Sequence, residues 1–497
     1  MNEPRASSGS PLHALLRIAV DVKPHEVAAL GWSWLYLFCL MSGYYVLRPL
    51  RDEIGSVRGA DDLPWLYTAT FFTMLAAVPA FSWLVARYSR RTFIPLVYRF
   101  FNLNLMLFFL ALTLLPEDAS YPVALAFYVW VSVYNLFVVA VFWGFMADLF
   151  RSDQGKRLFG FIAFGASFGG VMGGLAVSAL AEPLGRTPLM LVTIVLLEAA
   201  VWCVSALMRQ ARRVAGGEGD TKNPHPGPLP GGEGERAGGE GVTPAVEAPI
   251  RGTMWAGFTT TLASPYLLGI VAYVFLYTYT STVLYYQQAE LVNVTFESRD
   301  ARAAFFARID VAVNALSLLC QAFLTGRVMK RLGVALTLTI LPAVTAAGFL
   351  LIGWAAWLDL GGGASGGDAG DAAGGAWWWG GVPPIVAVFV GVQVLRRAGN
   401  FAFGKPARDV LYTIVPREDK YKAKSFIDTA VYRGGDVLSG WCFAGMQAIG
   451  LGAVGISFIT APLAMIWGAV AIGLGARFRR AAHPPGQSAD AARSTDS

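Results

Sequence analysis

Five arginines and three carboxylates lie inside long apolar stretches of this sequence, where charged side chains are rare. The arginines are Arg99, Arg308, Arg396, Arg397 and Arg433, and the acids are Glu198, Asp310 and Asp436. Two further arginines, Arg48 and Arg51, stand at the end of the first stretch beside Asp52. Guanidinium groups bind phosphate and carboxylate through paired hydrogen bonds. The excess of positive charge therefore predicts one kind of chemistry, the binding of an anion.

The spacing of the polar residues places them on shared helix faces, because residues three or four apart lie on one side of an α-helix. Three such stripes are Gln393, Arg396, Arg397 and Asn400; Asp310, Asn314, Ser317 and Gln321; and Ser425, Asp428, Thr429, Tyr432 and Asp436. Several polar stripes in apolar helices indicate a polar interior. Arg396 and Arg397 are adjacent and point in different directions, so at least one is expected to face that interior.

Some of these charges also have a structural interpretation. Arg433 and Asp436 are three residues apart and form either a structural ion pair or part of a binding site. Arg308 lies near the end of its stretch and either reaches the membrane surface, pairs with Asp310 or another helix, or contacts a ligand. Glu198 has no local basic partner and is either a coupling carboxylate or a residue at the lipid boundary.

The apolar stretches have the length of membrane-spanning helices, which need about 20 residues. Of the 497 residues, 55% are hydrophobic and 14% are charged, whereas soluble chains are about 25% charged. This composition argues against a soluble enzyme and predicts an all-α membrane protein. The predicted spans are residues 27–47, 64–86, 93–115, 122–147, 158–181, 188–208, 266–287, 302–325, 333–358, 382–404, 425–447 and 452–476.

A Gly/Pro-rich segment divides these twelve predicted helices into six and six. Residues 214–250 contain ten Gly and six Pro, so they have no capacity to form a core and are predicted to be a flexible linker. It separates two predicted six-helix bundles, 27–213 and 251–476, with tails at 1–26 and 477–497. Short basic loops at equivalent places, 87–91 and 326–333, support a repeat, and the arrangement matches the major facilitator type of transporter.

The distribution of basic residues predicts the orientation. With the N-terminus inside, the inner segments carry 28 of the 39 Lys and Arg residues, and the outer loops carry six. Loops rich in Lys and Arg stay in the cytoplasm. The sequence therefore predicts a multi-pass protein of the inner membrane with both termini and the linker in the cytoplasm.

Metal and nucleophile chemistry have little support in the sequence. The cysteines, Cys39, Cys203, Cys320 and Cys442, lie singly in apolar stretches, and all four histidines lie outside them. No Walker A pattern is present, so energy is expected from a gradient or from exchange. We expect no enzyme activity, metal, cofactor or nucleic-acid partner.

Three segments resemble the ATP/ADP translocase family of nucleotide exchangers. Leu47-Arg-Pro-Leu-Arg-Asp52 is similar to its helix-one motif Leu-Arg-x-x-Lys-Asp, with Arg51 in place of Lys. Residues 142–145 (Phe-Trp-Gly-Phe) with 156–159 (Lys-Arg-Leu-Phe) resemble a second motif, and 422–428 (Lys-Ala-Lys-Ser-Phe-Ile-Asp) a third. The resemblance implies a divergent major facilitator protein that carries nucleotides, and makes Arg51, Lys422 and Lys424 candidate phosphate contacts.

Together, these observations predict a secondary transporter that acts as a monomer in the lipid bilayer on an anionic, nucleotide-like solute such as ATP or ADP. The alternatives are a proton-coupled transporter of an unrelated small molecule and a non-transporting membrane sensor. The predicted substrate-binding residues are Arg48, Arg51, Arg396, Arg397, Asn400, Lys422, Lys424 and Arg433. The predicted coupling or charge-pairing residues are Asp52, Glu198, Asp310 and Asp436.

Overall fold

The computed structural model describes residues 22–23, 26–88, 90–150, 152–217, 254–361, 384–416, 423–424 and 426–482. Within these ranges every regular element is a helix, which confirms the predicted fold class. Ten helices there are long and apolar enough to cross a membrane, and Leu63–Pro79 adds a shorter apolar segment. The predicted tails and the predicted linker lie almost entirely outside the described residues, as does the glycine-rich stretch after Gly361.

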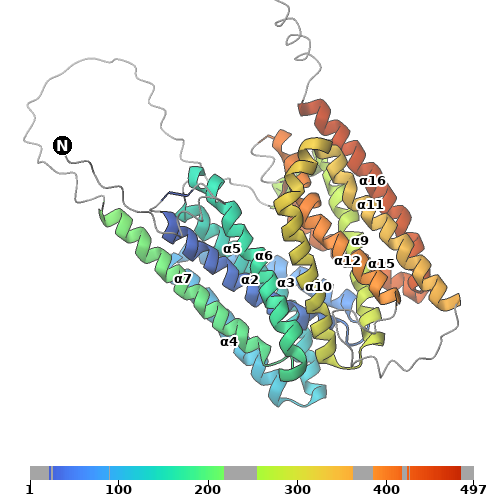
Figure 1. The fold of residues 1–497 in the computed structure, drawn as a ribbon, viewed down its shortest axis with the longest axis horizontal. Helices are drawn as coiled ribbons and strands as arrows, with labels where there is room; N and C mark the ends of the chain where they lie inside the picture. Colours follow the sequence, from blue (N-terminus) through green and yellow to red (C-terminus); the bar gives the residue numbers. More distant parts are fainter. Residues whose placement is uncertain are drawn as a thin grey trace, which may run out of the picture.

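The first six membrane helices pack together on one side of the molecule (Figure 1). They are α2 (Val27–Gly55), α3 (Leu63–Arg87), α4 (Arg90–Leu114), α5 (Glu117–Leu149), α6 (Ser152–Leu184) and α7 (Leu189–Gly217). We call the side on which α2 begins the proximal side, and the side on which it ends the distal side. Successive helices run in alternating directions between the two sides, as the loop positions predict.

The remaining helices form a second group beside the first (Figure 1). They are α8 (Met254–Ala263), α9 (Pro265–Thr295), α10 (Arg299–Phe323), α11 (Thr325–Gly361), α12 (Pro384–Gly399), the π-helix η3 (Asn400–Gly404), α13 (Lys405–Leu411), the 3-10 helix η4 (Tyr412–Ile414), the π-helix η5 (Ile427–Val431), α15 (Tyr432–Ala448) and α16 (Ala453–Ala482). Within the described residues, each of the twelve predicted spans falls largely on helices of these two groups.

Two details differ from the sequence prediction. The short helix α8 precedes α9 in a place where no helix was predicted. The segment 326–333, predicted as a loop, is helical up to a break at Gly333, where φ is 71° and ψ is 170°. Only glycine adopts this left-handed region without strain, so Gly333 ends the first turns and sets the direction of the long helix that follows.

Helix α6 contacts α2 of its own group and α10 of the other group closely, because glycines lie on both of these faces. Gly169 and Gly173 face α2 so closely that a Cβ would lie 2.7 Å from the Phe38 carbonyl oxygen and 2.4 Å from that of Ser42. Gly174 faces α10 of the other group, where a Cβ would lie 2.7 Å from Val311. The glycine spacing therefore permits close helix contact, as the sequence predicts.

An ion pair fixes the proximal end of α2. The carboxylate of Glu26 is 3% exposed and lies 3.0 Å from the Arg157 guanidinium at the start of α6. Burial alone would raise the pKa of Glu26, but hydrogen bonds from the Lys23 N–H, Gln154 and Arg157 outweigh it and lower the pKa to about 2. Glu26 therefore stays ionised, and the pair holds the two helix starts together.

We predict that Gly173→Ala destabilises the protein, because its methyl group would collide with backbone and not with a movable side chain. Overpacking of this kind costs about 1–3 kcal/mol. Gly160→Ala on the same helix is the matched control, since nothing lies within 4 Å of its Cβ position. Thermal unfolding in detergent would measure both; equal midpoints for the two variants would contradict the prediction.

Candidate functional site

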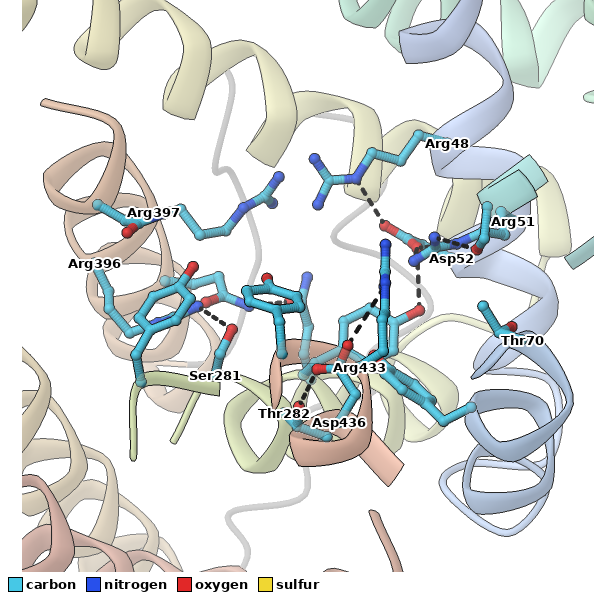
Figure 2. A pocket seen from close by; sticks show the side chains of 18 of the residues that line it. Arg48, Arg51, Asp52, Thr70, Ser281, Thr282, Arg396, Arg397, Arg433 and Asp436 are labelled. Carbon is cyan, nitrogen blue, oxygen red and sulfur yellow. Dashed lines mark hydrogen bonds and ion pairs between the residues drawn. The ribbon is translucent and has the colours of Figure 1, made fainter. Parts of the chain in front are cut away.

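A polar cavity of about 210 Å³ lies between the two groups of helices. Figure 2 shows arginines reaching into it from both sides. It is lined by Arg48, Arg51, Asp52, Tyr67, Thr70, Tyr128, Ser132, Tyr277, Ser281, Thr282, Tyr285, Gln288, Gln393, Arg396, Arg397, Asn400, Phe401, Tyr432, Arg433 and Asp436. No aliphatic side chain is among these residues, so the cavity suits a charged, hydrogen-bonding ligand.

The first group of helices contributes two arginines that share one carboxylate. On α2, Arg51 lies 3.0 Å from Asp52 and also donates a hydrogen bond to the Ser132 hydroxyl of α5 at 3.2 Å. Arg48, one helical turn before Asp52, lies 3.6 Å from the same carboxylate. The Tyr285 hydroxyl of α9 donates to Asp52 as well, at 3.0 Å. This carboxylate therefore orients both arginines and contacts the opposite group of helices.

Asp310 connects the two sides of the cavity. Its carboxylate is 1% exposed and lies 3.5 Å from Arg48 on α2 and 2.5 Å from Arg397 on α12. The same oxygen, Oδ1, makes both contacts, and Oδ2 has no hydrogen-bond partner among the described residues. Asp310 thus neutralises part of the charge of two arginines that belong to different helix groups.

Arg396 differs from the other arginines because it has no carboxylate partner among the described residues. It is 2% exposed, and its Nη2 donates to the Ser281 hydroxyl on α9 at 3.0 Å (Figure 2). Its Nε and Nη1 are buried without a hydrogen-bond partner in the described part of the chain. A buried charge with unused donors is costly, so these two nitrogens mark a place where an anion would be stabilised.

Arg433 and Asp436 form the ion pair that their spacing predicts, at 3.4 Å. The Thr282 hydroxyl on α9 donates to Asp436 at 3.0 Å. Both charged residues line the cavity, so the predicted ion pair is formed at the cavity wall, and a role in binding stays a prediction.

Several predicted site residues lie elsewhere. Lys424 pairs with Asp409 at 2.8 Å and is not among the cavity-lining residues. Lys422 lies outside the described residues. Glu198 is also absent from the cavity lining and pairs with Arg99 at 3.1 Å, a partner 99 positions away that local sequence could not indicate.

Arg308 takes one of the alternatives given for it. It lies 3.6 Å from Glu182 of α6 and is 36% exposed. A pair with Asp310, another of these alternatives, is not formed, because Asp310 pairs with Arg48 and Arg397 instead. The pair of Arg308 and Glu182 belongs to the surface where α6 and α10 meet.

The lining residues that were not predicted as site residues are uncharged, although the predicted polar stripes already included Gln393 and Tyr432. Five tyrosines line the cavity, and Gln393 on α12 donates to Gln288 on α9 at 2.6 Å. Two of those tyrosines, Tyr277 and Tyr285, lie on α9. The guanidinium of Arg396 lies 5.9 Å from the centre of the Tyr277 ring, within range of a cation–π interaction.

Two π-helical segments flank the cavity in the second group. The segment η3 starts at Asn400, directly after the arginine pair of α12, and η5 ends at Val431, directly before Tyr432 and Arg433. π-Helical turns are rare and concentrate at functional sites. Both helices that bring arginines from the second group therefore change their winding at the cavity wall.

On the distal side, a buried carboxylate holds the two helix groups together. Glu53 near the end of α2 is fully buried and accepts from Arg299 of α10 at 2.5 Å. It also lies 3.3 Å from Arg186, which follows α6 and pairs in turn with Asp300 of α10 at 3.2 Å. Four charges from both groups thus link the helices on the distal side.

Arg302 also links the two helix groups on the distal side, by donating hydrogen bonds to backbone carbonyl oxygens. It is 8% exposed and donates to the carbonyl oxygens of Ser56, Asn293 and Phe296 at 3.4, 3.1 and 2.7 Å. These carbonyls lie at the C-terminal ends of α2 and α9, where the helix dipoles favour a positive charge. One guanidinium therefore caps a helix end from each group.

The comparisons with known proteins identify the fold. The sequence matches no protein-family model and no curated relative. Among solved structures it is similar to a POT family transporter in complex with 5-aminolevulinic acid, at a TM-score of 0.59 and 11% identity over 90% of this chain and 96% of that one. A bacterial homologue of the iron transporter ferroportin in an inward-facing state gives 0.57 and 12%, over 91% and 98%.

A D-xylose–proton symporter gives a TM-score of 0.55 and 12% identity, over 91% of this chain and 97% of that one. At such low identities the likeness extends to the fold alone. The chain is an all-α membrane protein with a fold of the major facilitator type, as predicted.

We predict that Glu53→Gln opens the distal side, because it removes the negative charge that holds Arg186 and Arg299. Glu182→Gln is the matched control, since its pair with Arg308 also joins α6 to α10 but is exposed and contributes little. A cysteine at Thr70, introduced after the four native cysteines are replaced, reports on opening. Glu53→Gln should speed its labelling by an impermeant maleimide from the distal side severalfold; unchanged labelling would contradict the prediction.

Proposed function

We propose that this protein is a secondary transporter that carries a small organic anion across the membrane by alternating access. The observation that carries the proposal is the cavity between the two helix groups. Five arginines and two aspartates line it, and with Asp310, which pairs with two of these arginines from beside the cavity, the net charge is +2. Arg396 supplies the strongest part of this argument, because its two free nitrogens are buried inside the site. The similarity in fold to solved transporters supports the same conclusion.

The contacts between the two helix groups suggest which parts of the protein would move during transport. Residues 27–213 and 251–476 would act as the rocking bodies, with a closed distal side formed around Glu53 and the glycine-faced α6. The 28 basic residues of the proximal segments support a cytoplasmic location for that side and for both termini, in the inner membrane. In this orientation the ion pairs around Glu53 would close the outer side of the cavity.

A nucleotide is the finer proposal for the substrate. Its phosphates would be bound by Arg396, Arg397 and the arginines of α2, with Asn400 alongside. Five tyrosines and Phe401 provide ring faces for a base. The resemblance of the helix-one segment to the ATP/ADP translocase motif supports this choice, and the cavity lining is also suited to sugar phosphates and to dicarboxylates.

Proton coupling is a second candidate for the driving force, favoured by the position of Asp310. A substrate anion would compete with Asp310 for Arg48 and Arg397, and its binding would release the Asp310 carboxylate from these cations. The free Oδ2 atom and the 1% exposure of this residue support such a role. Exchange without protons remains the alternative that the resemblance implies.

We predict that Arg396→Ala weakens anion binding by about 10- to 100-fold, the effect of losing charge-assisted hydrogen bonds. Purified protein would be screened by thermal shift against ATP, ADP, a sugar phosphate and a dicarboxylate, and the stabilising anions would then be tested for uptake into proteoliposomes. Arg308→Ala, a surface arginine, should bind and transport like the unmodified protein. Absence of uptake of any anion, or full uptake by Arg396→Ala, would refute the proposal.

For the coupling mechanism, we predict that an inward proton gradient accelerates uptake and that Asp310→Asn transports at a rate independent of the gradient. The physical reason is that asparagine cannot take up a proton. Uptake would be measured in proteoliposomes at fixed internal pH while the external pH is varied. Uptake that needs internal substrate but ignores the gradient in the unmodified protein would instead establish exchange.

A further inference from the structure

An ion pair lies on the lipid-facing surface of the first helix group, well away from the cavity. Arg99 of α4 and Glu198 of α7 are 3.1 Å apart, and their side chains are 64% and 34% exposed. These two helices form the outer edge of the molecule on that side (Figure 1). The pair plays no part in the proposed transport site, so its presence in an apolar surface needs a separate explanation.

The depth of Glu198 in its helix makes lipid exposure costly. The apolar span of α7 runs from Leu189 to Gln210. At 1.5 Å per residue, Glu198 lies about 13 Å from one end and about 18 Å from the other. A glutamate side chain is too short to reach the membrane surface over that distance. Charges at this depth are normally covered by protein or water, even when they are paired.

The equivalent surface of the second group shows what an ordinary lipid-facing edge looks like in this protein. Helices α11 and α16 occupy the opposite edge of the molecule (Figure 1). Residues 333–358 and 453–476 contain no charged residue. Their exposed large side chains are apolar, including Leu350, Trp354, Phe458, Met465 and Ile466. The charges are therefore specific to the edge formed by α4 and α7.

We propose that this edge is the interface of a homodimer in the membrane. We define the α4/α7 face by Arg99, Leu103, Leu107, Val195, Glu198 and Trp202, all of which are partly or largely exposed. In the dimer, Arg99 of each copy approaches Glu198 of the other, so that four alternating charges are covered by two apolar surfaces. The interface replaces the functional monomer expected from the sequence.

The charge pattern favours a second copy over other occupants. A face that carries one cation beside one anion is complementary to itself under a two-fold axis, which is the commonest symmetry of oligomers. The apolar span of α7 is about as long as an ordinary bilayer core is thick. A lipid headgroup would therefore have to enter the hydrocarbon by more than about 10 Å to reach Glu198. Leu103 and Leu107 on α4 and Val195 and Trp202 on α7 supply apolar contact around the charges.

A charge-reversal mixture tests the proposal directly. In Arg99→Glu both positions are acidic, and in Glu198→Arg both are basic, so neither variant can form the pair within one copy or within its own dimer. Mixed together, the two variants can pair only between copies. Fluorescently labelled protein would be reconstituted in phosphatidylethanolamine/phosphatidylglycerol vesicles at low density, and its state would be read from single-molecule photobleaching and from energy transfer between differently labelled variants.

The unmodified protein should bleach in two steps, each variant alone in one step, and the mixture in two steps with energy transfer restored. Arg308→Glu is the matched control, because it reverses an exposed arginine outside this face and should remain dimeric. Monodisperse gel filtration of every variant in detergent guards against loss of folding. Single-step bleaching of the unmodified protein, or a mixture that stays monomeric, would overturn the proposal. The readout contains no substrate, so it is independent of the proposed transport function.

Discussion

Positive charge buried in an apolar protein must be neutralised, and most of this structure can be understood from how that is done. Three aspartates in and beside the cavity hold four arginines, and Arg396 has no carboxylate partner in the described part of the chain. Because Asp52 and Asp310 are each shared between two arginines, the network has no carboxylate left for a fifth. A bound anion would neutralise the remaining positive charge, that of Arg396.

The same electrostatic links also connect the two helix groups. Arg48 and Asp310 belong to different groups, as do Glu53 and Arg299 on the distal side. In addition, the glycines of α6 allow its backbone to approach both α2 and α10. The groups are therefore held by these polar contacts, by the close approach of α6 to α10, and by apolar contacts such as that of Trp65 on α3 with Trp441 on α15.

The sequence predicted the helices well, because a span of apolar residues long enough for a bilayer has few alternatives. It also identified Arg48, Arg51, Arg396, Arg397, Arg433 and their aspartates as unusual, and the structure gathers these at one cavity. It could not separate Arg396 from Arg397, because the rotation of α12 decides which of them reaches Asp310. The ion-pair partner of Lys424 and the place of the tyrosines in the cavity wall also depend on how separate segments pack. Residue type alone does not predict such packing.

The π-helical turn at Asn400–Gly404 sets the phase of everything that follows it on that helix. Each residue of an ordinary α-helix advances by about 100° around the axis, and a π turn accommodates one residue more than an α turn does. Deleting a single residue there would turn Arg408 by roughly that angle and point it away from Asp428, its ion-pair partner at 3.3 Å. The number of residues in Asn400–Gly404 is therefore constrained, as is the identity of a charged residue in the cavity. Among related chains, a deletion in this segment would indicate a different arrangement of the proximal side.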